Sequence, residues 1–159
     1  MNIAIVGATG LVGSKMLEIL EERDFSIEKI IPIASKKSEG VLIDFCGKRY
    51  KVISIENSVN EEIDIALFSA GAEVSLKWAP QFKMKGVYVI DNSSAWRMSE
   101  NVKLIIPEIN GNLLESNDKI NANPKCATIQ MLMALAPIHK KFKIERIIVS
   151  TYQSVTGTG

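Results

Sequence analysis

One cysteine stands where a protein could use its thiol as a nucleophile. Cys126 follows Asn123-Pro124-Lys125 and begins an apolar run with helical spacing. The first N–H groups of a helix favour negative charge, so a thiol at a helix start is more readily ionised to the nucleophilic thiolate. The residues around Cys126 therefore predict covalent chemistry through sulfur.

A glycine-rich turn near the N-terminus predicts a dinucleotide site. Gly7, Gly10 and Gly13 lie between a short apolar run and a helical pattern. Glycine at the first two positions allows a phosphate to approach the backbone, and Gly13 allows the helix to pack on the sheet. A reactive thiol and a nicotinamide site on one chain suggest aldehyde oxidation through a thioester.

The residues after the second apolar run indicate which nicotinamide cofactor is bound. An acidic residue at this place would favour NAD, but Ser35, Lys36, Lys37 and Ser38 precede the first acid, Glu39. Cations and hydroxyls can hold a 2′-phosphate. The pattern therefore predicts NADP, with Ser35, Lys37 and Ser38 as contacts.

A second polar cluster spans Asp91 to Arg97, directly after another apolar run. Ligands of parallel sheets lie at the carboxyl ends of the strands, so we expect this loop, including Asn92, to line the same crevice. The planar fork of Arg97 is suited to an oxyanion or a phosphate.

These residues need an α/β scaffold with a doubly wound, mostly parallel, Rossmann-like sheet, because strand and helix patterns alternate with short connections. Strands are predicted at 2–6, 27–34, 63–68, 87–90, 103–106, 118–122 and 144–153, with a hairpin over 41–55 and helices at 11–23, 73–85 and 128–142. We expect a cofactor domain over 1–122 and a nucleophile helix with an incomplete further domain over 123–159. A glycine-rich turn at the end of the chain suggests truncation.

Composition excludes several other classes of function. The 19 basic and 18 acidic residues nearly cancel, which argues against nucleic acid or an anionic membrane as partner. The single histidine and two cysteines have no metal-ligand spacing, so no metal is expected. No apolar run reaches the roughly 18 residues of a membrane span. No signal peptide precedes the first strand, so we expect a cytoplasmic protein.

Two further residues are predicted to lie outside the chemistry. Cys46 falls within the hairpin and is expected to be an inert, buried thiol. His139 lies 13 positions after Cys126, or about 20 Å along a helix, so it cannot serve as the base for that thiol.

With these residues in hand, the chain resembles the amino-terminal part of aspartate-semialdehyde dehydrogenase. The resemblance runs from Met1 to Gly159. It is carried by the ordered motifs at 7–13, 37–38, 69–71, 91–98, 107–110, 123–130 and 150–153. The family reversibly reduces aspartyl-4-phosphate with NADPH to aspartate-4-semialdehyde and phosphate, for lysine, threonine and methionine synthesis, and forms dimers or tetramers.

The resemblance also implies roles for individual residues. Cys126 would hold the acyl thioester, Arg97 would bind the phosphate, and Gln153 would orient the substrate or thioester. The cofactor contacts would be Thr9, Gly10, Leu11, Val12, Lys37, Ser38, Ser69, Ala70, Gly71, Thr156 and Gly157.

The chain departs from the family pattern at the nucleophile. Lys125 and Ala127 stand where the family has asparagine and serine, and losing an oxyanion donor typically costs about 10²–10³ in rate. Lys37 replaces a family arginine and lacks its bidentate fork. The family's histidine acid/base and carboxylate-binding arginine lie in a part not present, so we expect cofactor binding with little turnover.

Three other interpretations compete with this one. An acetylglutamyl-phosphate type reductase would use the same thioester chemistry. A short-chain dehydrogenase-like or sensor protein often carries a similar glycine turn, but it needs a Tyr-x-x-x-Lys pair that this sequence lacks. The chain could also be a nucleotide-binding remnant without catalysis.

Overall fold

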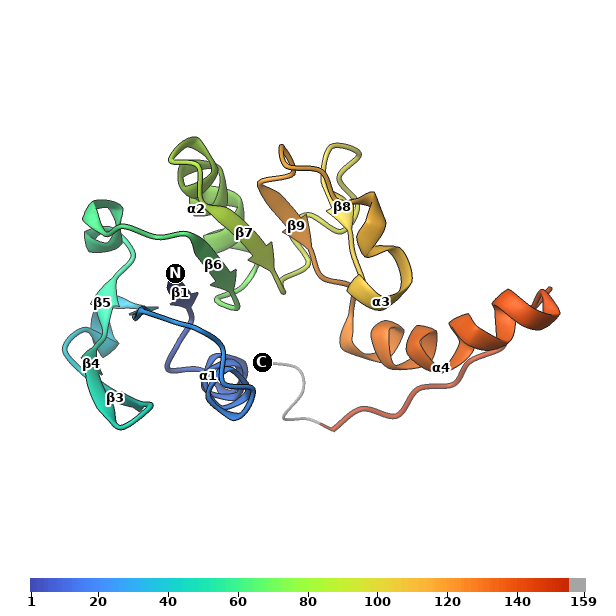
Figure 1. Ribbon diagram of the computed structural model, residues 1–159, viewed down its shortest axis with the longest axis horizontal. Coiled ribbons are helices and arrows are strands. Elements are labelled where there is room, and N and C mark those ends of the chain that lie inside the picture. The colour runs from blue at the N-terminus through green and yellow to red at the C-terminus, as the bar shows by residue number, and fades with distance from the viewer. Residues whose placement is uncertain (155–159) are drawn as a thin grey trace.

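The computed structural model describes residues 1–154, and its main element is a seven-stranded sheet (Figure 1). The strand order is β5-β2-β1-β6-β7-β9-β8, and all pairings in this sheet are parallel. The chain winds outward on both sides of β1, so the predicted doubly wound, Rossmann-like α/β fold is confirmed. The strands are β1 (Asn2–Val6), β2 (Lys29–Ala34), β5 (Ile53–Ser54), β6 (Ile65–Phe68), β7 (Tyr88–Asp91), β8 (Lys103–Leu104) and β9 (Ile120–Ala122).

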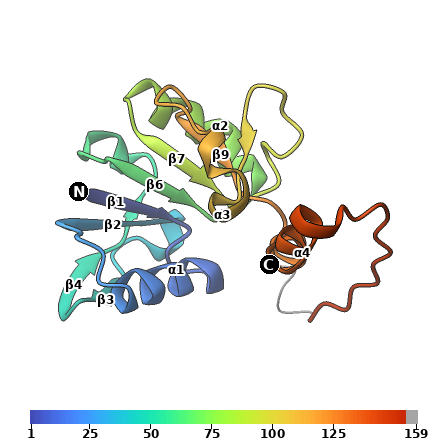
Figure 2. The ribbon, with the colours of Figure 1, turned by 45° about the vertical axis from the view of Figure 1, so that its right-hand side comes forward.

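Each face of the sheet has its own hydrophobic core, because successive residues of a strand point to opposite faces. On one face Ile5 packs with Leu17 of α1. On the other face Val6 packs with Phe82 of α2. Figure 2 shows α1 and α2 on opposite sides of the sheet. The two helices are α1 (Leu11–Glu22) and α2 (Ala72–Met84). Ile5 and Val6 are both at most 1% exposed, and each such side chain stabilises the fold by about 1.5–3 kcal/mol.

The predicted hairpin is present and enlarges the core under α1. Strands β3 (Leu42–Phe45) and β4 (Lys48–Lys51) pair antiparallel around a turn at Cys46 and Gly47. Phe45 is buried in the α1-side core and meets the ring of Tyr50 edge-on at 6.4 Å. Short helices complete the connections: η1 (Lys36–Ser38), η2 (Asn57–Asn60), α3 (Pro107–Asn110) and η3 (Gly111–Leu113).

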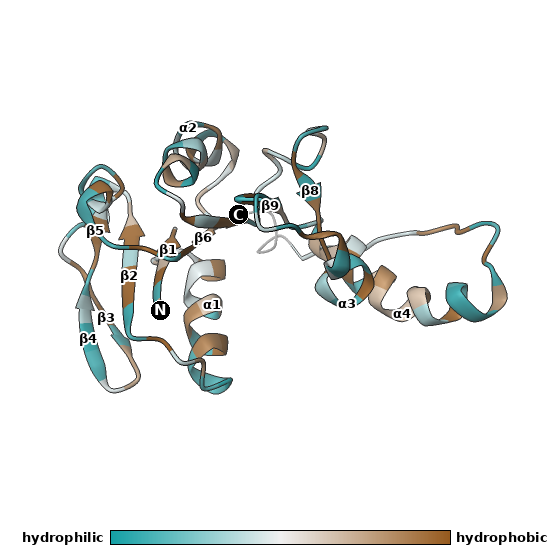
Figure 3. Cartoon of the chain, turned by 45° about the horizontal axis from the view of Figure 1, so that its top comes forward, coloured by the Kyte–Doolittle hydropathy of each residue, from teal (hydrophilic) through white to brown (hydrophobic). Residues whose placement is uncertain are grey.

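Helix α4 (Cys126–Phe142) and the segment that follows it extend away from the sheet (Figures 1 and 3). No residue of α4 is buried. The strand predicted over 144–153 is wrong, because these residues form neither strand nor helix. An isolated run of apolar and β-branched residues becomes a strand only when a neighbour accepts its backbone hydrogen bonds, and none of residues 1–154 pairs with it.

Candidate active site at the carboxyl edge of the sheet

The predicted site residues follow the carboxyl ends of five neighbouring strands. Val6 of β1 pairs with Ile33 of β2 and Phe68 of β6, and Asp91 of β7 pairs with Phe68 and with Ala122 of β9. Because the strands are parallel, all five ends meet at one edge of the sheet. The segments after them carry, in order along that edge, Ser35, Gly7, Ser69, Asn92 and Asn123.

The glycine turn is packed against the chain that follows β6. Gly7 has φ +96°, and a Cβ added there would lie 2.6 Å from the Ser69 carbonyl oxygen. A Cβ on Gly13 would lie only 2.2 Å from the Gly7 carbonyl oxygen. The turn is therefore possible only with hydrogen in place of both side chains. It brings the predicted cofactor residues of 7–12 and 69–71 into contact.

The start of α1 offers unpaired donors at this edge. Gly10 is the N-cap and supplies no side-chain cap. The Gly10 N–H donates to the Gly7 carbonyl, and within α1 the first N–H with an acceptor is that of Ser14, which bonds to the Gly10 carbonyl. The N–H groups of Leu11 to Gly13 therefore have no acceptor within residues 1–154. Leu11 and Val12 are exposed, at 66% and 43%. An open helix N-terminus beside a glycine turn fits the pyrophosphate of a dinucleotide.

The chain after β2 has the polar groups expected of a 2′-phosphate site. Ser35 is the N-cap of η1, whose Lys36 and Lys37 are exposed. The first acid, Glu39, accepts a hydrogen bond from Asn57 Nδ2 at 2.8 Å. Its carboxylate is therefore held by η2. The hydroxyl of Ser35 and the cations of Lys36 and Lys37 are therefore better placed than the Glu39 carboxylate to meet a ligand.

The loop after β7 is held by its own buried side chains. Asp91 is fully buried, and its Oδ2 accepts from the hydroxyl of Ser93 at 2.7 Å. Ser93 Oγ in turn accepts from the backbone N–H of Ala95 at 3.1 Å. Trp96 Nε1 donates to the buried hydroxyl of Ser75 on α2 at 2.8 Å. These bonds fix the turn that carries Asn92 and Arg97.

Arg97 joins this loop to the segment that leads into Cys126. Its Nε donates to the carbonyl of Asn123 and its Nη2 donates to the carbonyl of Asn92, both at 2.9 Å. Asn123 Nδ2 also donates to Asn92 Oδ1 at 2.7 Å. Two of the five N–H donors of the guanidinium are thus used, and the other three have no partner within residues 1–154.

The other predicted catalytic residues lie on and beyond α4. Cys126 is exposed and is the first residue of the helix, as the sequence indicates. His139 lies on the same helix as Cys126. The 13 positions between them therefore correspond to about 20 Å along the helix axis. Gln153 lies in the exposed segment after α4. It takes no part in the Arg97–Asn123 bonds. Thr156 and Gly157 lie outside the described residues.

Cys46 is not buried, which corrects the expectation for this thiol. It occupies the β3–β4 turn with φ +48°, a left-handed conformation that turns the residue away from the core beneath Phe45. Its backbone N–H donates to Glu21 Oε1 at 2.9 Å. Partial desolvation of the sulfur, together with the Glu21 and Asp24 carboxylates, raises the pKa of Cys46 and outweighs the opposing effect of Lys48.

We therefore expect Cys46 to be alkylated by iodoacetamide more slowly than a cysteine peptide at neutral pH. A raised pKa means less thiolate below that pKa, so the difference should shrink as the pH rises through it. Glu21→Gln should bring the Cys46 rate closer to that of the peptide. Peptide mapping by mass spectrometry measures the rate, and a Cys46 rate equal to the peptide's at neutral pH would contradict this account.

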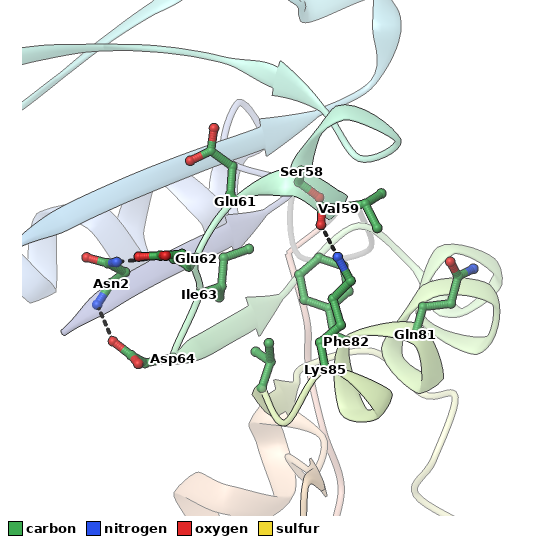
Figure 4. A pocket seen from close by; sticks show the side chains of 11 residues that line it. Asn2, Ser58, Val59, Glu61, Glu62, Ile63, Asp64, Gln81, Phe82 and Lys85 are labelled. Atoms are coloured by element: carbon green, nitrogen blue, oxygen red, sulfur yellow. Dashed lines mark hydrogen bonds between the residues drawn. The ribbon is translucent and has the colours of Figure 1, made fainter.

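One cavity lies at the opposite edge of the sheet (Figure 4). It has a volume of about 450 Å³ and contains none of the predicted site residues. Asn2 Nδ2 donates to the Glu62 carbonyl at 3.1 Å, while Asn2 Oδ1 is buried and has no hydrogen-bond partner among residues 1–154. Lys85 bonds to the Val59 carbonyl across the cavity. The open start of α1 and the predicted nucleophile lie at the other, carboxyl edge, where ligands of parallel sheets generally bind.

Two negative findings hold for residues 1–154. No helix among them is long and apolar enough to cross a membrane. No group of three or more histidine, cysteine, aspartate or glutamate side chains could hold a metal ion.

The fold and this edge define a dinucleotide-binding α/β domain, and comparison with known proteins identifies its family. Residues 2–117 match the family model described as "Semialdehyde dehydrogenase, NAD binding domain". The chain belongs to the semialdehyde dehydrogenase family.

Proteins similar to this chain include several aspartate-semialdehyde dehydrogenases. That of Aquifex aeolicus is 52% identical over 99% of this chain, and that of Bacillus subtilis is 45% identical over all of it. The crystal structure of aspartate semialdehyde dehydrogenase II from Vibrio cholerae covers 99% of this chain at 48% identity, with a TM-score of 0.93. This chain spans about half of these relatives, namely 47%, 46% and 48% of their lengths.

Proposed function

We propose that this chain carries the cofactor site and the nucleophile of an aspartate-semialdehyde dehydrogenase. The reaction would be the reversible, NADPH-dependent reduction of aspartyl-4-phosphate to aspartate-4-semialdehyde and phosphate, in lysine, threonine and methionine biosynthesis. One observation supports it above all others. The glycine turn, the Arg97 loop and the segment leading to Cys126 follow β1, β7 and β9 at the same edge of the sheet. Strands β7 and β9 are adjacent, and hydrogen bonds join the two segments that follow them.

Each residue has a role that follows from its chemistry. The Cys126 thiolate attacks the acyl carbon, a C–S bond forms, the bond to phosphate breaks, and phosphate leaves. The free donors of Arg97 bind the phosphate oxygens, Asn92 donates a hydrogen bond to the ligand, and Gln153 orients the acyl group. A nicotinamide bound at this edge would supply the hydride for the acyl carbon, and the C–S bond would then break to give the aldehyde and the free Cys126 thiolate. Lys125 at the N-cap of α4 places a cation beside the thiol in place of an amide donor.

The cofactor is proposed to be held along the same edge. The N–H groups at the start of α1 would bind the pyrophosphate. Gly7, Thr9 and residues 69–71 would line the same site. Ser35, Lys37 and Ser38 would bind the 2′-phosphate of NADP, because Glu39 is engaged by Asn57.

Lys37→Glu is expected to weaken NADPH binding by about tenfold to a hundredfold and to leave NADH binding nearly unchanged. The carboxylate repels the 2′-phosphate, which NADH lacks. Lys140→Glu is the matched control, because it makes the same charge change at an exposed position of α4 that is outside the proposed cofactor site. Calorimetric titration gives both affinities. An equal loss for NADPH and NADH would contradict the assignment of Lys37 to the 2′-phosphate.

The acyl-transfer step can be tested without cofactor. Incubation with aspartyl phosphate should release phosphate stoichiometrically and leave one aspartyl group per chain, as measured by intact mass and located by peptide mapping on Cys126. We expect one equivalent and not continuous turnover. Absence of the adduct, or its presence on Cys46, would contradict the proposed function.

A further inference from the structure

We propose that Asn123 is a positioning residue that fixes which end of the Asn92 side-chain amide is presented to the ligand. This inference rests on the proposed function, because it assigns Asn92 to a ligand at the carboxyl edge of the sheet. It goes beyond that function by giving a role to a residue that does not itself contact the reacting atoms. It also predicts the hydrogen-bonding polarity of the site.

Asn123 is itself held from three directions. Its backbone N–H donates to the Asp91 carbonyl at 2.8 Å, and its carbonyl accepts from Arg97 Nε at 2.9 Å. Its side-chain Nδ2 donates to Asn92 Oδ1 at 2.7 Å. Because β9 pairs with β7 directly before this point, Asn123 has little freedom to move relative to the Asn92 loop.

Asn92 is fixed at its backbone in the same way. Its N–H donates to the Phe68 carbonyl at 2.9 Å, and its carbonyl accepts from Arg97 Nη2 at 2.9 Å. The orientation of its amide is then set by the bond from Asn123, which uses Oδ1. The Nδ2 group has no partner within residues 1–154, so it is the group offered to a ligand. A donor there suits an oxygen acceptor, either the nicotinamide carboxamide oxygen or a phosphate oxygen.

Asn123→Asp tests this polarity because a carboxylate can only accept hydrogen bonds. In this variant we expect the Asn92 side-chain amide to flip by about 180°, so that Nδ2 donates to residue 123 and Oδ1 faces the ligand. Asn92 Oδ1 would then face the acceptor oxygen of the ligand with no hydrogen between them. Affinity for the ligand should therefore fall by about tenfold to a hundredfold. Protonation of the new carboxyl group restores a donor to Asn92 Oδ1. Affinity should therefore recover as the pH falls and be lost again as it rises, which a general loss of structure would not reproduce.

Three probes identify the ligand oxygen. NADPH carries the carboxamide, 2′,5′-ADP lacks it, and inorganic phosphate reports on the Arg97 side of the site. A loss for NADPH with 2′,5′-ADP unchanged assigns Asn92 to the carboxamide. A loss for phosphate alone assigns it to the substrate phosphate. Asn117→Asp, an exposed residue before β9, is the control for the added charge. Wild-type affinity for all three probes in Asn123→Asp would overturn the inference.

A ligand-free measurement keeps the inference separate from the proposed function. In side-chain amide NMR spectra of the wild-type chain, the Asn123 NH2 should exchange slowly with solvent and the Asn92 NH2 rapidly. In Asn123→Asp the Asn92 NH2 should become the protected group. Protection of the Asn92 NH2 in the wild type would overturn the positioning role. Failure of the wild type to bind NADPH would count against the proposed function instead, whichever way the amides exchange.

Discussion

Cys126→Ser is expected to abolish acyl transfer from aspartyl phosphate, with a fall in rate on the order of 10⁴–10⁶-fold. A hydroxyl at this position is far less ionised than a thiol, and no histidine lies close enough to act as its base, since His139 is about 20 Å away on the same helix. Phosphate release and intact mass measure the effect.

The stability of the variant must be unchanged for this result to bear on chemistry. Cys126 is exposed at the first position of α4, so its replacement should leave the melting temperature nearly unaltered. Cys46→Ser is the matched control, because it removes the other exposed thiol and should keep full acylation. Acylation of the Cys126→Ser chain at the wild-type rate would remove this residue from the mechanism.

Gly13→Ala is expected to destabilise the fold by about 3 kcal/mol and to abolish cofactor binding. The added Cβ would lie 2.2 Å from the Gly7 carbonyl oxygen and 2.8 Å from its carbon, both backbone atoms. Helix α1 would have to move away from the turn that it packs on. The direction of the change in unfolding free energy is informative, because replacing glycine by alanine inside an ordinary helix stabilises the helix by about 1 kcal/mol.

Gly111→Ala is the control for this substitution. Gly111 has an ordinary φ of −59°, and a Cβ there would meet only the Pro107 side chain at 3.8 Å. Urea unfolding should show the Gly111 variant within about 0.5 kcal/mol of the wild type. A Gly13 variant equally stable would show that the close approach of α1 to the turn is not required.

Most of the edge that carries the candidate site could be predicted from the sequence. Buried parallel strands are nearly continuous apolar runs, so the points where such runs end at Gly7, Ser69 and Asp91 mark one edge of the sheet before any coordinates are known. The helix start at Cys126 follows from a proline turn before an apolar run. These patterns involve residues that are close in the sequence, so they can be interpreted without knowledge of tertiary contacts.

The interactions that join the segments could not be predicted. The bond of Asn123 to Asn92 spans 31 positions, and that of Trp96 to Ser75 spans 21. Their partners become neighbours only after the sheet has formed. The residue type of Arg97 predicts an oxyanion or a phosphate as its ligand, and only the structure shows that two of its N–H groups bind backbone carbonyls.

Two expectations failed because they used residue type without tertiary context. Apolar and β-branched residues over 144–153 predict a strand, but strand formation depends on a pairing partner. Cysteine is usually buried, but Cys46 falls in a two-residue turn whose left-handed backbone places it outside the core. In both cases the surroundings of the residue decided the outcome.

The most direct test of the account is a backbone amide NMR titration of this chain with NADPH. We expect chemical-shift changes at the carboxyl edge of the sheet, at residues 7–13, 35–38 and 69–71. Shifts confined to the opposite edge, at the cavity lined by Asn2, Asp64 and Lys85, would contradict it.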